Sequence, residues 1–240
     1  MVDHQFVLFV MPPILGYDDK MSRIIAVGNL KGGVGKSTLA VNLACELAST
    51  QRVRLVDADA QATVSEWMAA GSLPITGEAL PLDDERRAAT WIKRIQASDA
   101  DVVVIDLPPH TGAATAAALI LADLFVVPVA PSGLDLRAAA KALDMLREAR
   151  AARGDGKPAA LLVPSRVDRR TGAGREIEAA LHEMGEPVGP AIGARSAFVD
   201  SATANNWVGH FAPRSVAHQE VAALAALVDR ITRRKGKHGT

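Results

Sequence analysis

Short apolar runs alternate with alanine-rich segments of helical length along most of this 240-residue chain. Uninterrupted runs of this kind are typical of strands that are buried on both faces of a parallel sheet. They lie at 24–27, 53–56, 102–105, 124–127 and 160–163, with a further short strand expected at 188–192. Helices are expected at 38–48, 62–70, 85–97, 113–121, 134–153, 174–184 and 216–231, and a loop at 71–83. The alternation predicts one doubly wound, mostly parallel α/β sheet with helices on both faces and right-handed crossovers.

Composition narrows the classes of function that the chain can serve. Hydrophobic residues make up 49% and aromatic residues only 4%, so alanine, valine, leucine and isoleucine must fill the core. The formal net charge is zero, so any binding of nucleic acid requires a local basic patch. Cys45 is the single cysteine, which excludes a disulfide framework or a multi-cysteine metal or iron–sulfur site within one chain. This usage favours a cytoplasmic protein.

Residues 1–20 are expected to be an N-terminal extension to a single domain, residues 21–240, which ends in a basic tail. The extension is interpreted as a loose arm or as an extra edge strand. A further interpretation is that Met21 is the true first residue of the protein. Its apolar stretch at 6–15 is too short to span a bilayer and is broken by Pro12 and Pro13. It also lacks the basic start and the cleavage site of a signal peptide.

The segment Lys31–Thr38, KGGVGKST, lies between the first expected strand and the first expected helix. Its glycines let the backbone curl and point N–H groups inward, and the helix N-terminus adds partial positive charge. We expect Lys36 to reach the β- and γ-phosphates of a nucleotide and the Ser37 hydroxyl to ligate Mg²⁺. The strict phosphate-loop pattern needs glycine where this chain has Leu30, and Lys31 adds a second lysine at the front of the loop.

Carboxylates follow two of the expected strands. Asp57 and Asp59 come after the strand at 53–56, and Asp106 after the strand at 102–105. Ligands of such sheets lie beyond the carboxyl ends of the strands, so these residues are expected beside the phosphate loop. There Asp106 is expected to hold Mg²⁺ through water. The pair Asp57 and Asp59 is expected to act on hydrated Mg²⁺ and on an attacking water.

Taken together, these segments resemble the deviant Walker A ATPases of the ParA/MinD group. KGGVGKST is similar to their phosphate loop, Asp57–Gln61 to their D-x-D-P-Q box with Ala60 in place of the proline, and Ile105–Pro109 to their Walker B end. The resemblance implies that Lys31 reaches across a dimer to the nucleotide of the other subunit. It implies that Asp59 positions or activates the water and that Asp57 supports the metal shell. The implied catalytic residues are Lys31, Lys36 and Asp59, the metal residues are Ser37, Asp57 and Asp106, and the nucleotide-binding residues are Lys31, Gly32, Gly33, Val34, Gly35, Lys36, Ser37, Thr38 and Arg166.

Two further segments have both a functional and a purely structural interpretation. Val127–Asp135 is similar to the group's P-x-x-P-S-x-x-D segment near the nucleotide and the dimer face. The alternative is a proline turn followed by a helix capped by Ser132 or Asp135. Arg166 follows the fifth strand at the place that lies beside the adenine in relatives, where it either stacks on the base or is solvated.

Basic residues cluster in the second half of the chain and are predicted to bind DNA. The cluster contains Arg166, Arg169, Arg170 and Arg175, opposed within that stretch by Asp168 alone, with Arg195 further along and a basic C-terminus from Arg230 to Lys237. A single charge run is more often a solvated face. A dimer presents each patch twice, which makes weak contacts to phosphates avid and salt-sensitive.

The resemblance is closest to small ParA-like, or ParF-like, partition ATPases. It implies ATP and Mg²⁺ as ligands, an ATP-dependent homodimer, non-specific binding to double-stranded DNA, and weak hydrolysis stimulated by a ParB-like or ParG-like centromere-binding protein. Such a protein would be cytoplasmic and nucleoid-associated. The alternatives are a MinD-like membrane-associated positioning ATPase and a VirC1-like DNA-transfer ATPase. The apolar stripe of the C-terminal helix lacks Phe and Trp, so core packing is favoured over membrane binding.

Overall fold

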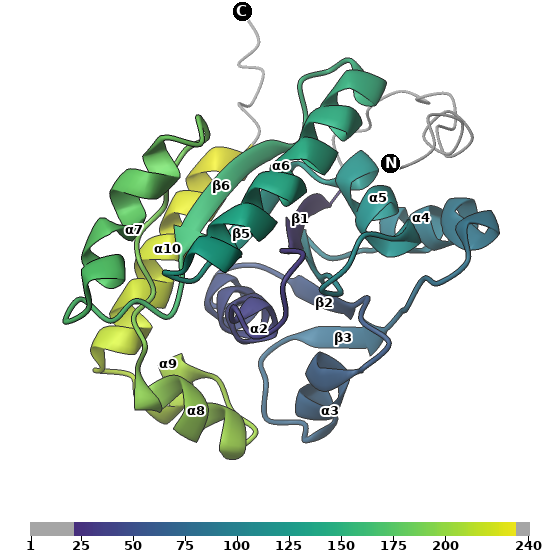
Figure 1. The fold of residues 1–240 in the computed structure, drawn as a ribbon. Helices are drawn as coiled ribbons and strands as arrows, with labels where there is room; N and C mark the ends of the chain where they lie inside the picture. Colours follow the sequence, from purple (N-terminus) through teal and green to yellow (C-terminus); the bar gives the residue numbers. More distant parts are fainter. Residues whose placement is uncertain (1–21, 234–240) are drawn as a thin grey trace, which may run out of the picture.

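A computed structural model of the chain describes residues 22–233, so the predictions for the N-terminal extension and for the tail beyond Arg233 lie outside the described residues. Six parallel strands form one sheet in the order β3-β2-β4-β1-β5-β6 (Figure 1). The strands are β1 (Arg23–Val27), β2 (Val53–Asp57), β3 (Thr76–Ala79), β4 (Val102–Asp106), β5 (Leu124–Val129) and β6 (Ala159–Pro164). The doubly wound parallel sheet expected from the sequence is thereby confirmed.

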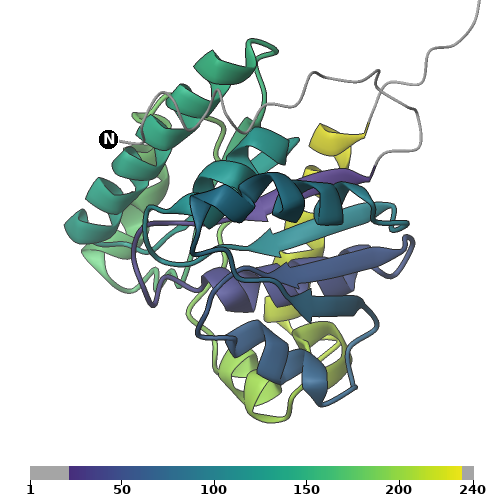
Figure 2. The same cartoon turned by 90° about the vertical axis from the view of Figure 1, so that its right-hand side faces the viewer.

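Helices cover both faces of this sheet (Figure 2). One layer contains η1 (Glu85–Arg87), α4 (Ala88–Gln96), α5 (Ala113–Leu121), α6 (Gly133–Arg153) and α7 (Gly172–His182). The other contains α2 (Lys36–Leu47), α3 (Thr63–Ala69), α8 (Ser196–Thr203), α9 (Val208–Phe211) and α10 (Val216–Thr232). Strands β1, β2, β4, β5 and β6 therefore bury side chains on both faces, which explains the uninterrupted apolar runs in the sequence.

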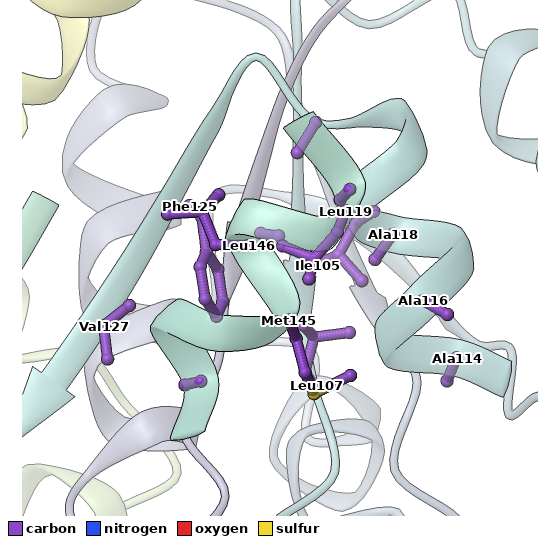
Figure 3. Packing of buried hydrophobic residues seen from close by; sticks show 14 of the residues in the cluster. Ile105, Leu107, Ala114, Ala116, Ala118, Leu119, Phe125, Val127, Met145 and Leu146 are labelled. Atoms are coloured by element: carbon purple, nitrogen blue, oxygen red, sulfur yellow. The ribbon is translucent and has the colours of Figure 1, made fainter. Parts of the chain in front are cut away.

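Alanine-rich helices bring the backbones of the first layer close to the sheet. Phe125 of β5 is 1% exposed and packs with Ile105, with Leu107 just after β4, and with Leu146 of α6 (Figure 3). Ala117 of α5 is fully buried in the same cluster. Small side chains on α5 leave room for these larger ones, so a core with few aromatic residues is still filled.

Two local expectations about strands are wrong. The segment 71–83 is not all loop, because Thr76–Ala79 pairs in parallel with β2 as the edge strand β3. The segment 188–192 is not a strand, because only isolated bridges, Leu162 with Val188 and Val167 with Gly193, join this region to the chain near β6. Residues 76–79 are polar or small and mostly exposed, so a hydrophobic pattern does not predict this strand. Around 188–192, Pro187 and Pro190 lack the N–H groups that a strand ladder needs.

Helix α10 packs along α2, and its apolar stripe belongs to the core. Val221, Leu224 and Val228 are fully buried in the cluster that also contains α2, as core packing required. At the start of α10, His218 Nε2 lies 2.9 Å from Glu46 Oε2 of α2, and its Nδ1 lies 2.7 Å from the carbonyl oxygen of Pro213. Because both neighbours are acceptors, the doubly protonated ring satisfies both of them.

This cluster predicts a pH-dependent contribution of His218 to stability. Burial lowers the pKa of His218, but the hydrogen bonds that the ring donates to Pro213 and Glu46, together with the charge of Glu46, outweigh it and raise the pKa above the ordinary value. The stabilisation is therefore complete below the unfolded-state pKa of about 6.5 and is lost as the pH rises through the raised pKa of the folded state. Urea unfolding should show that His218→Gln costs about 1 kcal/mol at pH 6 and much less at pH 9. Glu46→Gln should remove the same pH dependence, and equal costs of His218→Gln at both pH values would contradict this assignment.

Candidate nucleotide-binding site

The loop between β1 and α2 has the conformation of an anion cradle. Gly33 and Gly35 have φ values of 78° and 92°, which side-chain-bearing residues rarely adopt. A Cβ on Gly35 would lie 3.1 Å from Ser165 Oγ, whereas a Cβ on Gly32 or Gly33 would meet nothing within 4 Å. The space in front of Gly32 and Gly33 is thus open to a ligand. The N-terminus of α2 begins at this loop and adds its dipole.

Lys36 lies inside the curl of the loop. It is 7% exposed, and its Nζ donates a 2.8 Å hydrogen bond to the carbonyl oxygen of Lys31. Burial lowers the pKa of Lys36, while the charges of Asp106 and Asp59 act in the opposite direction. A buried ammonium whose one hydrogen-bond partner within residues 22–233 is a carbonyl oxygen is a strong site for the negative charge of phosphates.

Ser37 and Asp106 meet at the base of the loop. The Ser37 hydroxyl donates to Asp106 Oδ2 at 2.7 Å, and Asp106 is 1% exposed. Its other oxygen, Oδ1, is buried and has no hydrogen-bond partner in the described part of the chain. Burial raises the pKa of Asp106 to about 7, with the hydrogen bond from Ser37 opposing it. A hydroxyl beside an unpaired carboxylate oxygen is a donor set that fits hydrated Mg²⁺, so these residues suit the predicted cation.

Asp57 ends β2 and Asp59 lies on the loop that joins β2 to α3, and the two carboxylates differ in their surroundings. Asp57 is fully buried, and its carboxylate accepts hydrogen bonds from Asp59 N at 3.1 Å and from Ser65 N and Oγ at 2.8 and 2.9 Å. Asp59 is half-buried and accepts a hydrogen bond from Gln61 N at 3.0 Å. Both oxygens of Asp57 are therefore occupied by protein donors, and its predicted place in the metal shell stays a prediction.

Lys31 points away from its own phosphate loop. Its Nζ donates to Asp135 Oδ2 of α6 at 2.9 Å, and the Lys31 side chain is 36% exposed whereas that of Asp135 is 6% exposed. Ser132 caps α6 by accepting from Asp135 N, and its hydroxyl also bonds the Asp135 carboxylate. The helix-cap interpretation of Ser132 is thus confirmed, while the contact between Lys31 and Asp135 was not expected from the sequence.

A cavity of about 640 Å³ extends from the phosphate loop to α8. Arg166, with φ of 55°, lines it and donates from Nη1 to the carbonyl oxygen of Gly33 at 2.6 Å. Phe198, Val199 and Thr203 of α8 form the opposite wall. The cavity is large enough for a nucleoside beside the cradle. Its α8 wall was missed in the sequence, because nothing local marks this helix as facing the loop.

Three of the predicted DNA-binding arginines, Arg169, Arg170 and Arg175, lie around the start of α7, and each has a protein partner. Arg169 pairs with Glu178 at 2.5 Å, and Arg170 pairs with Asp168 at 2.7 Å. Arg175 donates to the carbonyl oxygens of Arg169 and Arg170. Asp168 is therefore not the sole acidic opponent of this cluster, because Glu178 of α7 folds back onto it.

Arg195 lies at the start of α8 and lines, with Arg169 and Arg170, a second surface cavity. It pairs with Glu220 of α10 at 2.5 Å, and Glu220 also accepts a hydrogen bond from Gly193 N. Arg195 also lines the cavity beside Arg166. The contact of Arg195 with DNA stays a prediction.

None of the helices in residues 22–233 has the length and hydropathy needed to cross a membrane.

The model of the CobQ/CobB/MinD/ParA nucleotide binding domain family matches residues 25–206. The Maintenance of carboxysome distribution protein A of Halothiobacillus neapolitanus is 33% identical over 68% of this chain and 76% of that protein. The chromosome-partitioning ATPase Soj of Thermus thermophilus is 31% identical over 69% of this chain and 78% of that protein. The solved septum site-determining protein MinD of Pyrococcus horikoshii, complexed with Mg-ADP, has a TM-score of 0.72 at 21% identity, covering 88% of this chain and 97% of that one.

Proposed function

We propose that this chain, which belongs to the CobQ/CobB/MinD/ParA family of nucleotide-binding domains, is an ATP-dependent dimerisation switch. The premise is that it is a P-loop ATPase of the positioning and partition type. In the ATP-bound form the dimer binds DNA without sequence preference and drives partition. Hydrolysis is slow alone and is stimulated by a centromere-binding adaptor of ParB-like or ParG-like kind. The working location is the nucleoid.

The observation that carries the switch is the different placement of the two loop lysines. Lys36 is buried inside its own loop, whereas Lys31 turns outward and pairs with Asp135. An outward cation at the mouth of a phosphate site is useful when a second subunit presents its own phosphates to it. Lys31 must then leave Asp135, so the pair favours the monomer until the partner's triphosphate offers more negative charge.

Within each subunit the residues divide the work on ATP. The cradle at Gly32 and Gly33 and the Lys36 ammonium hold the phosphates, and Ser37 and Asp106 are the residues that would hold Mg²⁺. Bound there, Mg²⁺ supplies charge neutralisation at the phosphates. Asp59 orients the attacking water and accepts its proton, which general-base residues do at a gain of about 10²–10⁴ in rate.

The proposal is tested by following assembly and DNA retention in parallel. Size-exclusion chromatography with light scattering should show dimers with ATP and Mg²⁺, and monomers with ADP. Retention on non-specific double-stranded DNA should require ATP, and pelleting with anionic liposomes should not occur in either state. A protein that stays monomeric with ATP would overturn the switch, and ATP-dependent liposome pelleting without DNA retention would favour the MinD-like alternative.

A second candidate cargo is favoured by the similarity to the carboxysome distribution protein. The same ATP switch on DNA would then space a large protein assembly instead of a plasmid or chromosome. The switch itself is common to both, so the adaptor decides between them. Stimulation of hydrolysis by a DNA-binding adaptor would support a plasmid or chromosome as the cargo. Stimulation by an adaptor that co-sediments with a protein shell would support a large protein assembly as the cargo.

Arginines near the start of α7 provide a direct test of DNA binding. Arg166→Ala with Arg169→Ala should weaken DNA binding of the ATP dimer and lower the slope of log K against log salt by about 0.9 for each lost phosphate contact. Fluorescence anisotropy at two salt concentrations measures this, with dimerisation followed separately. Arg86→Ala with Arg87→Ala removes the same charge from exposed residues of η1 and should leave DNA binding unchanged. Arg169→Ala alone separates an effect on DNA binding from any effect of Arg166 on nucleotide binding. Undiminished DNA affinity in both the single and the double variant would show that these arginines do not bind DNA.

A further inference from the structure

The buried carboxylate of Asp57 ties both ends of the β2–α3 loop together. One oxygen accepts from the backbone of Asp59, and the other accepts from both the backbone N–H and the hydroxyl of Ser65. Ser65 lies in the first turn of α3, where N–H groups lack helical partners, so Asp57 also serves as an acceptor for that turn. The loop that carries Asp59 is therefore closed by these three hydrogen bonds.

The turn at residues 59–62 of this loop has only local constraints in the described part of the chain. Position 60 is alanine, which does not restrict φ as a proline would. Ala62 has a left-handed φ of 57°, a conformation that costs alanine energy and that the surrounding bonds must hold. Asp59 itself is stabilised by bonds within the turn, since its side chain accepts from Gln61 N and its carbonyl accepts from Ala62 N. These local bonds shape the turn but do not anchor it to the sheet.

Asp57 provides that anchor beside the nucleotide site. It pairs in register with Asp106 of β4, and Ala58 N donates to the Asp106 carbonyl oxygen at 3.0 Å. The start of the loop is thus fixed to the strand that carries the predicted cation residue. Its far end is fixed by Val64 and Trp67 of α3, which are buried in the core, and by the contact of Ser65 with Asp57. The contact between Ser65 and Asp57 joins this far end directly to the end of β2, two residues before Asp59.

We infer that Ser65 is a positioning residue for ATP hydrolysis, which acts through Asp57 to hold the Asp59 loop in place. This inference rests on the proposed role of Asp59 and concerns the hydrolytic step, not ATP binding. Ser65 contributes a neutral hydroxyl to a buried carboxylate, and hydrogen bonds to charged groups are stronger than neutral ones. Loss of that hydroxyl leaves the Asp57 carboxylate with the backbone N–H groups of Asp59 and Ser65 as its donors in the described part of the chain.

The test compares Ser65→Ala with Ser65→Thr and with a matched control, Thr63→Ala, which removes a hydroxyl from the same turn of α3 without touching Asp57. In the full chain, Ser65→Ala should lower kcat for ATP about tenfold, while the Kd for a fluorescent ATP analogue stays within about twofold. Ser65→Thr should restore kcat, and Thr63→Ala should leave it unchanged. The Mg²⁺ concentration for half-maximal activity should not move in any of the three.

Hydrogen exchange of the nucleotide-free protein provides a readout that does not depend on activity. The amides of Asp59 and Ser65 should exchange about tenfold faster in Ser65→Ala than in the parent or in Thr63→Ala. Unchanged exchange and unchanged kcat, or a kcat loss matched by lost ATP binding, would overturn the inference. If Asp59→Ala hydrolyses ATP normally, the proposed role of Asp59 fails instead. If the parent hydrolyses ATP but never dimerises, the switch fails while the Ser65 inference can still hold.

Discussion

Lys36→Ala is expected to lower ATP affinity by about a hundredfold or more and to abolish measurable hydrolysis. The Lys36 ammonium is 7% exposed and has only the Lys31 carbonyl oxygen as a hydrogen-bond partner in the described chain, so phosphates would be its main counter-charge. Removing it leaves the cradle with backbone N–H groups and the dipole of α2, which bind phosphate more weakly. Binding of a fluorescent ATP analogue and release of inorganic phosphate measure the two effects.

Lys93→Ala is the matched control for this substitution. Lys93 is exposed on α4, on the layer of helices away from α2, so its loss should change neither measurement. Thermal unfolding should show both variants folded. ATP binding by Lys36→Ala at the level of the parent would count against the assignment of the loop as the nucleotide site.

Asp59→Ala is expected to trap ATP-bound dimers. The substitution removes the carboxylate proposed to orient the water, so hydrolysis should fall by about 10²–10⁴ while ATP binding remains. The dimer then persists, because ATP is no longer converted into ADP. Light scattering after incubation with ATP should show a long-lived dimer where the parent returns to monomer as ATP is consumed.

A second substitution tests whether that dimer depends on the outward lysine. Lys31→Ala in the Asp59→Ala background should return the protein to monomer in ATP, since the cation that bridges the subunits is lost. Asp144→Ala, which removes an exposed carboxylate from α6, should leave the parent's cycle unchanged. A double variant that still dimerises would mean that Lys31 does not act across the interface.

The order of elements and the position of the loop were predictable because both are encoded locally. Buried parallel strands need continuous apolar runs, and the segment at 102–105 therefore identifies β4 without reference to any partner. The phosphate loop needs glycines with positive φ and a lysine at the helix start, and these stand together in KGGVGKST. The acidic residues Asp57 and Asp106 end strands, so the parallel sheet brings both to the same edge.

Other features could not be predicted because their causes lie in distant parts of the chain. Strand β3 has exposed, polar residues and depends on pairing with β2 and on the ion pairs of Glu78 with Arg54 and Arg94. The segment 188–192 is apolar enough for a strand but makes only isolated bridges. In both cases backbone pairing, which the pattern of side chains does not report, decided the outcome.

By itself the sequence determined the doubly wound sheet, the phosphate cradle and the carboxylates beside it, because each depends on residues that are neighbours along the chain. Only the tertiary structure decided which donors surround those carboxylates and where the outward lysine rests. Lys31 and Asp135 are separated by 104 positions, and the α8 wall of the cavity lies still further from the loop. Such contacts depend on how helices dock on the sheet, and that docking follows from packing over the whole domain.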